Sequence, residues 1–162
     1  MDIEKKAEDF KSLARVVPKV DLTGLFLHSC KVNRASDALE HESVQVDMSS
    51  SGELLADQKD SFRAKVLLCL NIHSTGDERK ELLRIDSEYI LSYQLLGKKR
   101  PSTNDIEIFC SMNAVYNAWP YWRELVHSMA NRMDLPVPIM PLLKFKPSRR
   151  SGKKKDSPRK AG

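Results

Sequence analysis

Apolar and polar residues alternate along several stretches of the chain, as they do in strands that place one face on a core. This pattern predicts strands at residues 20–34, 43–49, 61–74 and 79–96. The clearest face is that of the third strand, with Phe62, Ala64, Val66, Leu68, Leu70 and Ile72. In the fourth, Leu83, Ile85, Ser87, Tyr89, Leu91 and Tyr93 share a face.

The first two strands are less regular. Residues 20–34 are partly apolar on both faces, with Leu22, Gly24, Phe26, His28, Cys30 and Val32 on one of them. This predicts that the strand has the core on one side and another element on the other. The short strand at 43–49 is followed by a serine- and glycine-containing loop at 49–52. Residues 53–60 are ambiguous between a helical turn and a crossover.

Helical spacing appears in three other stretches. Residues 2–17 form a short amphipathic pattern that Pro18 ends, with apolar positions Ile3, Ala7, Phe10, Leu13 or Ala14, and Val17. A helix this short needs a surface to lie on, and we expect that surface to be the body of the protein rather than a partner or client. Thr103 is the expected cap of a second helix, which is apolar over a wide arc.

Pro120 is expected to end that helix and open another, because proline is well suited to the first turn. The third helix then carries one apolar stripe: Trp122, Leu125, Val126, Met129 and Met133. Leu135-Pro136 is expected to stop it. The chain thus predicts an α+β fold, a four-stranded antiparallel meander followed by two helices packed on one face of the sheet.

One motif resembles a known family. Pro-Tyr-x-Arg-Glu, followed about ten residues on by Leu-Pro, resembles the C-terminal part of the SecB family of export chaperones, and the tryptophans around it resemble the divergent SecB-like proteins. The motif residues are Pro120, Tyr121, Arg123, Glu124, Leu135 and Pro136. The order of four strands and two helices, over roughly residues 20–143, is that of the same family.

The resemblance implies a chaperone that holds non-native polypeptides in apolar grooves without ATP and assembles as a homotetramer, a dimer of dimers. Its clients would be export precursors or one dedicated partner such as an antitoxin. The classical family member engages the SecA motor through an acidic tail and sheet surface. The tail here is basic, which puts that translocase contact in doubt.

Charge divides the chain in two. From Lys144 onward there are nine Lys or Arg and one acid, a net of +8, whereas the other 143 residues carry 18 basic and 21 acidic side chains, a net of −3. Residues 146–162 are therefore expected to be a disordered basic tail. We expect an N-terminal helix at 1–19 and a chaperone domain at 20–145. The tail supports an alternative function, association with nucleic acid through phosphate contacts.

Motifs of catalysis are missing. There is no phosphate-binding loop, zinc-protease or nucleophile-elbow motif, and the sequence indicates neither an enzyme nor a cofactor or metal site. His41, between Glu40 and Glu42, is the nearest approach to a ligand cluster and is expected to be solvated. The three cysteines are widely spaced, which predicts that each packs as a small apolar residue. Free cysteines of this kind also predict a reducing, cytoplasmic compartment for the protein. No signal peptide or membrane-spanning run is expected at the N-terminus or elsewhere.

The segment after the third helix has the composition expected of a groove that binds polypeptide clients. It is apolar, three prolines keep it extended, and aromatic residues precede it. The candidate client-binding residues are Tyr116, Trp119, Tyr121, Trp122, Leu135, Val137, Ile139, Met140, Leu142 and Leu143. The alternative, which is the more common fate of any single aromatic, is that they fill the core.

Overall fold

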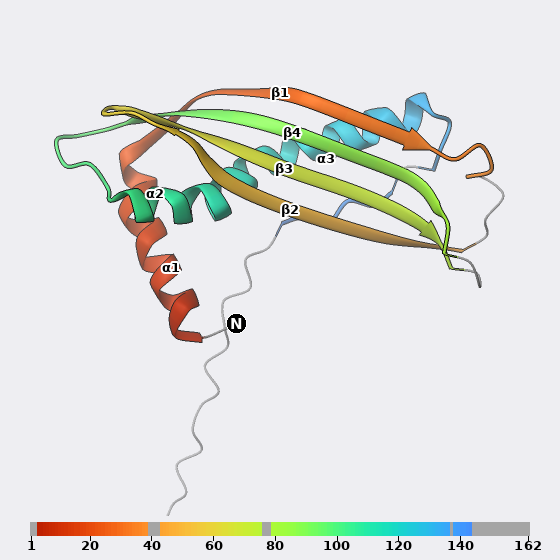
Figure 1. Ribbon diagram of the computed structural model, residues 1–162, viewed down its shortest axis with the longest axis horizontal. Helices are drawn as coiled ribbons and strands as arrows, with labels where there is room; N and C mark the ends of the chain where they lie inside the picture. Colours follow the sequence, from red (N-terminus) through yellow and green to blue (C-terminus); the bar gives the residue numbers. More distant parts are fainter. Residues whose placement is uncertain (1–2, 39–42, 76–78, 137, 144–162) are drawn as a thin grey trace, which may run out of the picture.

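The computed structural model describes residues 3–38, 43–75, 79–136 and 138–143, with the side chains of 3–7 outside the description. The strands are β1 (Val20–Arg34), β2 (Val44–Asp57), β3 (Ser61–Ser74) and β4 (Glu81–Leu95). The helices are α1 (Ile3–Val16), a 3-10 turn (Val17–Lys19), α2 (Thr103–Phe109), a π-helical turn (Cys110–Ala114) and α3 (Val115–Arg132). All four strands pair antiparallel in one sheet, and α2 and α3 lie along one of its faces (Figure 1).

The predicted α+β layer is confirmed, but the predicted meander is wrong for the first strand. The strand order is β1-β4-β3-β2, so β1 pairs with β4 rather than with β2. The connection between β1 and β2 is longer than the two-residue loop of a tight hairpin. It carries the chain from one edge of the sheet to the other, which leaves β1 and β2 as the two edge strands.

The core lies between the central strands and the helices. The predicted faces of β3 and β4 are confirmed, because Phe62, Val66, Leu70, Ile85 and Leu91 are all nearly inaccessible to solvent. Rings meet where the sheet and α2 touch: Phe62 and Tyr93 stack with centroids 4.9 Å apart, and Phe109 of α2 stands edge-on to both. Helix and sheet are thus joined by aromatic packing.

Two bulges make the predicted face of β1 wrong between them, at Gly24 and Phe26. Before and beyond the bulges the prediction holds, because Leu22, Cys30 and Val32 lie opposite Tyr93, Ser87 and Ile85 on the helix-covered face. The pairing register with β4 shifts between Leu22 and Gly24 and again between Leu27 and Ser29. Each shift inserts one extra residue and reverses the alternation beyond it. Leu25 and Leu27 therefore lie opposite Leu91 and Tyr89 on the helix-covered face, whereas Phe26 lies opposite Ile90 on the open face.

The predicted loop at residues 49–52 is also wrong. β2 runs without interruption from Val44 to Asp57 and pairs with β3 along that length. The serines and Gly52 are weak strand formers, but pairing with a long neighbour outweighs intrinsic preference. The ambiguous residues 53–57 belong to the same strand.

The prediction that Pro120 ends one helix and opens another is wrong. α3 continues through it from Val115 to Arg132, and the irregularity lies earlier, in the π-helical turn. Pro120 itself is exposed, whereas Trp119 and Trp122 on either side are buried. The missing N–H therefore costs one helical hydrogen bond, and the packing of the tryptophans against the sheet offsets it.

The helix ends follow local chemistry. Ser102, not the predicted Thr103, caps α2, and its hydroxyl accepts from the N–H of Asp105. At the other end, Asp134 has a positive φ of 54°. The N–H of Leu135 donates to the carbonyl of Ala130 at 3.0 Å and that of Asp134 to Asn131 at 3.2 Å. This is the Schellman pattern of a helix stop, in keeping with the predicted end at Leu135-Pro136.

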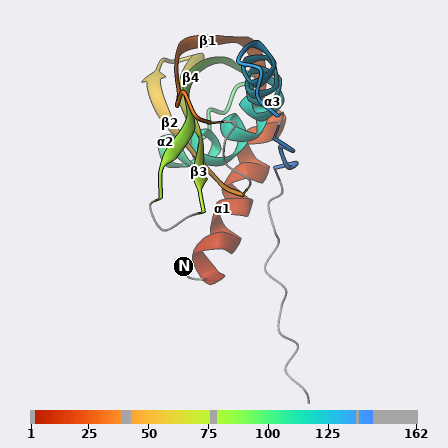
Figure 2. The ribbon, with the colours of Figure 1, turned by 90° about the vertical axis from the view of Figure 1, so that its right-hand side faces the viewer.

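The expectation that the N-terminal helix docks on the body is confirmed for its last turn. Val16 is fully buried in the core, and the guanidinium of Arg15 donates to the carboxylate of Asp105 at 2.6 Å. The predicted apolar stripe is wrong, because Phe10 and Val17 are exposed. Ile3 and Ala7 have side chains outside the description. The rest of α1 extends away from the sheet (Figures 1 and 2).

Candidate polypeptide-binding surface

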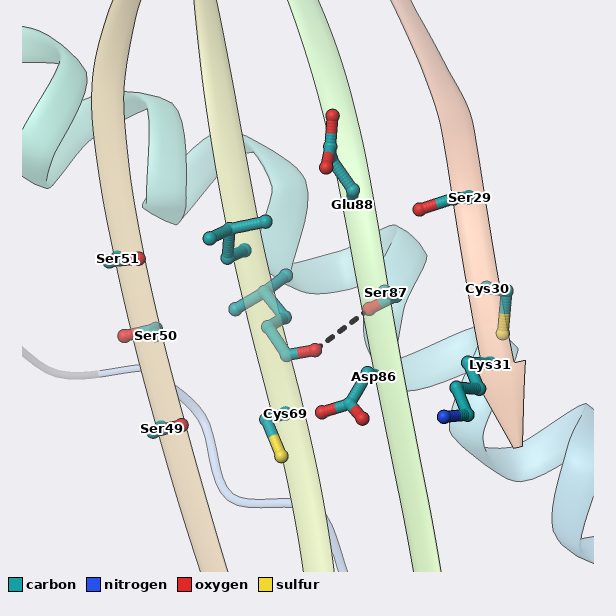
Figure 3. A pocket seen from close by; sticks show the side chains of 12 residues that line it. Ser29, Cys30, Lys31, Ser49, Ser50, Ser51, Cys69, Asp86, Ser87 and Glu88 are labelled. Carbon is teal, nitrogen blue, oxygen red and sulfur yellow. Dashed lines mark hydrogen bonds between the residues drawn. The ribbon is translucent and has the colours of Figure 1, made fainter. Parts of the chain in front are cut away.

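The open face of the sheet holds a depression of about 530 Å³, which we call the sheet pocket. Its lining, shown in Figure 3, is Ser29, Cys30, Lys31, Ser49, Ser50, Ser51, Leu67, Leu68, Cys69, Asp86, Ser87 and Glu88. The hydroxyl of Ser87 donates to the carbonyl of Leu68 at 3.0 Å, which satisfies a buried polar pair between neighbouring strands. The pocket is open, and although most of its lining residues are polar, most of its accessible surface is apolar.

The thiols of this pocket are poor nucleophiles. Burial raises the pKa of Cys69 to about 11, and a hydrogen bond with Asp86 acts in the same direction. Burial and the charge of Asp86 raise the pKa of Cys30 as well. Burial raises the pKa of Cys110, in the π-helical turn, to about 12. Because the thiolate is the reactive species, these cysteines lack the activation of catalytic thiols.

Carboxylates on the open face are largely paired. Glu53 lies 2.5 Å from the amine of Lys65, and Asp86 lies 2.7 Å from the guanidinium of Arg84. The hydrogen bond from Arg84 lowers the pKa of Asp86. Within the described ranges, no group of three or more His, Cys, Asp or Glu could hold a metal ion. The triplet around His41 lies outside the described residues.

The exit segment is described at residues 135–136 and 138–143, and it lies against α3 without regular secondary structure. The indole N–H of Trp119 donates to the carbonyl of Pro141 at 3.0 Å. Met140 is buried, and Leu135 and Leu143 pack against the core. Pro136, Pro138 and Pro141 fix φ and remove N–H donors. The described part of the segment is held by these side chains and by hydrogen bonds at its two ends, at Leu135 and Pro141.

Between α3 and this segment is a groove of about 410 Å³, which we call the α3 groove. Arg123, Glu124 and His127 of the helix line one side, and Pro138, Ile139 and Met140 line the other. Ile139 has 99% of its surface exposed. The described chain makes no use of this side chain, so it is available to an apolar partner.

The candidate client-binding residues divide into two groups. Tyr116, Tyr121, Ile139 and Leu142 are exposed, and Leu135 and Leu143 are partly so. Trp119, Trp122 and Met140 are buried, which is the core-filling alternative. Trp119 and Trp122 pack on each other with ring centroids 4.9 Å apart. Val137 lies outside the described residues.

The family-motif residues lie on α3 and at the start of the exit segment. Pro120, Tyr121 and Glu124 are exposed on α3, Pro136 is exposed in the exit segment, and Arg123 and Leu135 are partly buried. Arg123 and Glu124 both line the α3 groove. Neither is ion-paired among the described residues.

Sequence reasoning missed the apolar side chains of the edge strands. Val44, Val46 and Met48 of β2 and Leu22, Phe26 and Leu27 of β1 are all exposed. In β1 the signal is the apolar character of both faces, a pattern that equally fits a strand covered on both sides. An edge strand lacks a neighbour on one flank, and its side chains keep more of their surface.

Comparisons with known proteins identify the fold. No family model and no curated protein matches the sequence. Among solved structures, the Mycobacterium tuberculosis Rv1957 SecB-like chaperone, in complex with a ChAD peptide from the Rv1956 HigA1 antitoxin, superposes with a TM-score of 0.71. It is 18% identical, and the match covers 84% of this chain and 99% of that one. A Streptococcus agalactiae protein of unknown function has a TM-score of 0.42 at 10% identity, over 78% of this chain and 98% of that one. The chain therefore has the SecB-like fold.

Proposed function

We propose that this protein is an ATP-independent, SecB-like molecular chaperone that binds non-native polypeptides on apolar surface grooves. The observation that carries the proposal is the exposed apolar surface beside α3. Ile139 and Leu142 expose 99% and 65% of their surfaces, and Tyr116 and Tyr121 expose just over half.

Exposed apolar surface is unfavourable for the free protein in water. A chaperone that holds non-native polypeptides needs such surface to bind them. Burying apolar area stabilises a complex by roughly 25 cal/mol per Å², whatever the sequence that covers it. Extended clients present apolar side chains and unpaired backbone groups, and tyrosines offer them a flat apolar body with a polar tip. A groove between a helix and an extended segment matches that need.

The client we propose is a dedicated partner such as an antitoxin segment. Support comes from the fold neighbour, whose structure holds an antitoxin peptide. Export precursors are the second client class, and two features weigh against engagement of a SecA-type motor. The tail is basic, and carboxylates of the open sheet face are paired with Lys65 and Arg84.

The test is a holdase assay without nucleotide. A chemically unfolded, slow-folding protein is diluted into buffer with the chaperone, and aggregation is followed by light scattering. We expect suppression of aggregation. We also expect Ile139→Asp or Leu142→Asp to raise the concentration needed for half-suppression by roughly ten- to a hundredfold, since burying one apolar side chain contributes roughly 1.5–3 kcal/mol.

Matched variants separate the groove from the core and from the tail. Circular dichroism should be unchanged for both exposed-site variants, whereas Met140→Asp, at a buried position, should unfold the domain. Deleting residues 146–162 should leave suppression intact. If that deletion abolished binding and salt weakened it steeply, the protein would act on nucleic acid through its tail, which is the alternative function.

A further inference from the structure

Three segments that are far apart in the sequence meet at one end of the sheet. They are the 3-10 turn before β1, the turn between β2 and β3, and the connection from β4 to α2 (Figure 1). Hydrogen bonds join them. The N–H of Leu96 donates to the carbonyl of Lys19 at 2.7 Å, and the guanidinium of Arg100 donates to the carbonyl of Lys59 at 3.1 Å.

Positive charge gathers at this end of the sheet, which we call the basic end. Residues 17–19, 57–60 and 96–100 together hold five basic and two acidic side chains, a net of +3. Residues 1–143 carry −3 in all, so the remainder of them carries −6. The basic end is thus opposite in sign to the rest of the body, an asymmetry that steers and orients an approaching acidic partner.

The charge of the basic end comes mainly from four lysines: Lys19, Lys59, Lys98 and Lys99. All of them except Lys19, which is partly buried, are exposed. Over the part of the chain that the structure describes, none of the four forms an ion pair, whereas Lys65 and Lys80 each contact a carboxylate at 2.5 Å. Their ammonium groups are therefore available to the carboxylates of a partner.

Acidic side chains near the basic end do not neutralise it. Asp57 is already paired with Arg100, which leaves Asp60 as the other acid of the three segments. Asp21 and Arg63, the next charged residues along β1 and β3, offset each other. The four lysines therefore keep a positive excess.

The side chains among these lysines favour a polypeptide partner over a nucleic acid. Val17 and Leu96 expose 47% and 41% of their surfaces, and apolar groups of a polypeptide can cover them. Arginine is the residue that binds phosphate through a two-pronged fork, but Arg100, the one arginine of the three segments, is engaged by Asp57. The three segments contain no aromatic residue on which a base could stack.

We propose that the basic end docks an acidic, amphipathic polypeptide segment. Carboxylates of the partner pair with the four lysines, and its apolar side chains cover Val17 and Leu96. Exposed ion pairs are individually weak, so the partner needs several acids, and the contact supplies attraction and orientation more than tight holding. The basic end shares no residue with the α3 groove, and the inference does not depend on the proposed chaperone function.

The experiment compares two short fluorescein-labelled peptides, one of glutamate, leucine and alanine, the other with glutamine in place of every glutamate. Binding to the full-length protein is followed by fluorescence anisotropy. We expect the acidic peptide to bind about tenfold more tightly, the sum of several exposed ion pairs, and the difference to shrink in high salt. Lys98→Gln combined with Lys99→Gln, the lysine variant, should weaken binding of the acidic peptide about fivefold and leave the glutamine peptide unchanged.

The matched control removes two charges elsewhere. Arg34→Gln combined with Arg132→Gln changes two exposed side chains outside the basic end and should leave both affinities as they are. Circular dichroism should be the same for the wild type and for both variants, because all four side chains are exposed. Deletion of residues 146–162 should keep the preference for the acidic peptide and its loss in the lysine variant.

Each other outcome would overturn the inference. Equal binding of the acidic peptide to the wild type and the lysine variant would exclude the basic end as its site, and loss of binding on deletion of the tail would assign the peptide to the tail. A single-stranded oligonucleotide that loses as much affinity as the peptide in the lysine variant would make this a nucleic-acid surface. A changed mass of the lysine variant in light scattering would assign it to contacts between copies. Suppression of aggregation is measured separately, so the chaperone function stands or falls on its own test.

Discussion

At the scale of single residues, Gly52 decides how closely the helices approach the sheet. It lies on β2, opposite Val66. A Cβ at this position would stand 2.1 Å from the carbonyl oxygen of Cys110 and 3.0 Å from a methyl of Val115. No real Cβ approaches an oxygen so closely, so the π-helical turn would have to move. A glycine that resembles a loop signal in the sequence is in fact the contact point of two layers.

Gly52→Ala should therefore destabilise the domain by about 1–3 kcal/mol, the usual cost of overpacking. Equilibrium unfolding in urea, followed by tryptophan fluorescence, measures this as a lower midpoint. Gly24→Ala is the matched control, because a Cβ on Gly24 would meet its nearest neighbour, Ser92, at 3.8 Å. An unchanged midpoint for Gly52→Ala would show that the close approach to Cys110 does not exist.

At the scale of elements, α1 is attached to the body by its last turn. Arg15 donates two hydrogen bonds to the carboxylate of Asp105, at 2.6 and 3.3 Å, and the backbone N–H of Asp105 donates to the hydroxyl of Ser102, the cap of α2. The hydrogen bond from Arg15 lowers the pKa of Asp105 well below its ordinary value. A negative charge in the first turn of α2 also suits the helix dipole.

The pair of Arg15 and Asp105 makes the free energy of unfolding depend on pH in the acid range. Because the folded protein holds Asp105 ionised, the unfolded chain binds the proton more readily, and stability is lost as the pH falls below about 4, the ordinary aspartate value. Urea midpoints measured from pH 6 downward should fall more steeply for wild type than for Asp105→Asn. Arg15→Gln should flatten the profile in the same way. Parallel profiles for all three proteins would exclude this pair as the origin of the acid sensitivity.

At the scale of the whole molecule, exposed apolar side chains lie at both sheet edges and beside α3. The free edges of β1 and β2 offer long rows of backbone groups, which soluble proteins normally cover or pair. Exposed apolar groups thus lie at three separate places on the described surface. Self-association would bury the apolar surface that a client leaves exposed. We therefore propose the homotetramer, a dimer of dimers, that the SecB resemblance implies.

Light scattering coupled to size exclusion should give a mass near four times the 18.5 kDa of the chain. The value should persist in high salt, because apolar contacts are not screened. Removal of residues 146–162 is the control and should leave the assembly state unchanged. A monomer at all concentrations and salts would contradict the proposed assembly.

The sequence by itself determined what depends on local pattern. The alternation of Phe62 through Ile72 gave β3 and its buried face, and helical spacing from Trp122 to Met133 gave the packed side of α3. Those signals are strong because one side of each element is apolar and the other is not. The exposed part of the candidate surface, Ile139 and Leu142, was predictable from an apolar run broken by prolines.

Only the tertiary structure decided what depends on a distant partner. Pairing with β3 makes a strand of the serines before Gly52, and packing of Trp122 carries α3 through Pro120. The bulges of β1 follow from its register with β4, which no local pattern contains. Burial of Trp119 and Trp122, and the unpartnered Nε of Arg123, likewise depend on which segments meet. Local preferences amount to tenths of a kcal/mol per residue, whereas packing and pairing contribute more, so they prevail where the two conflict.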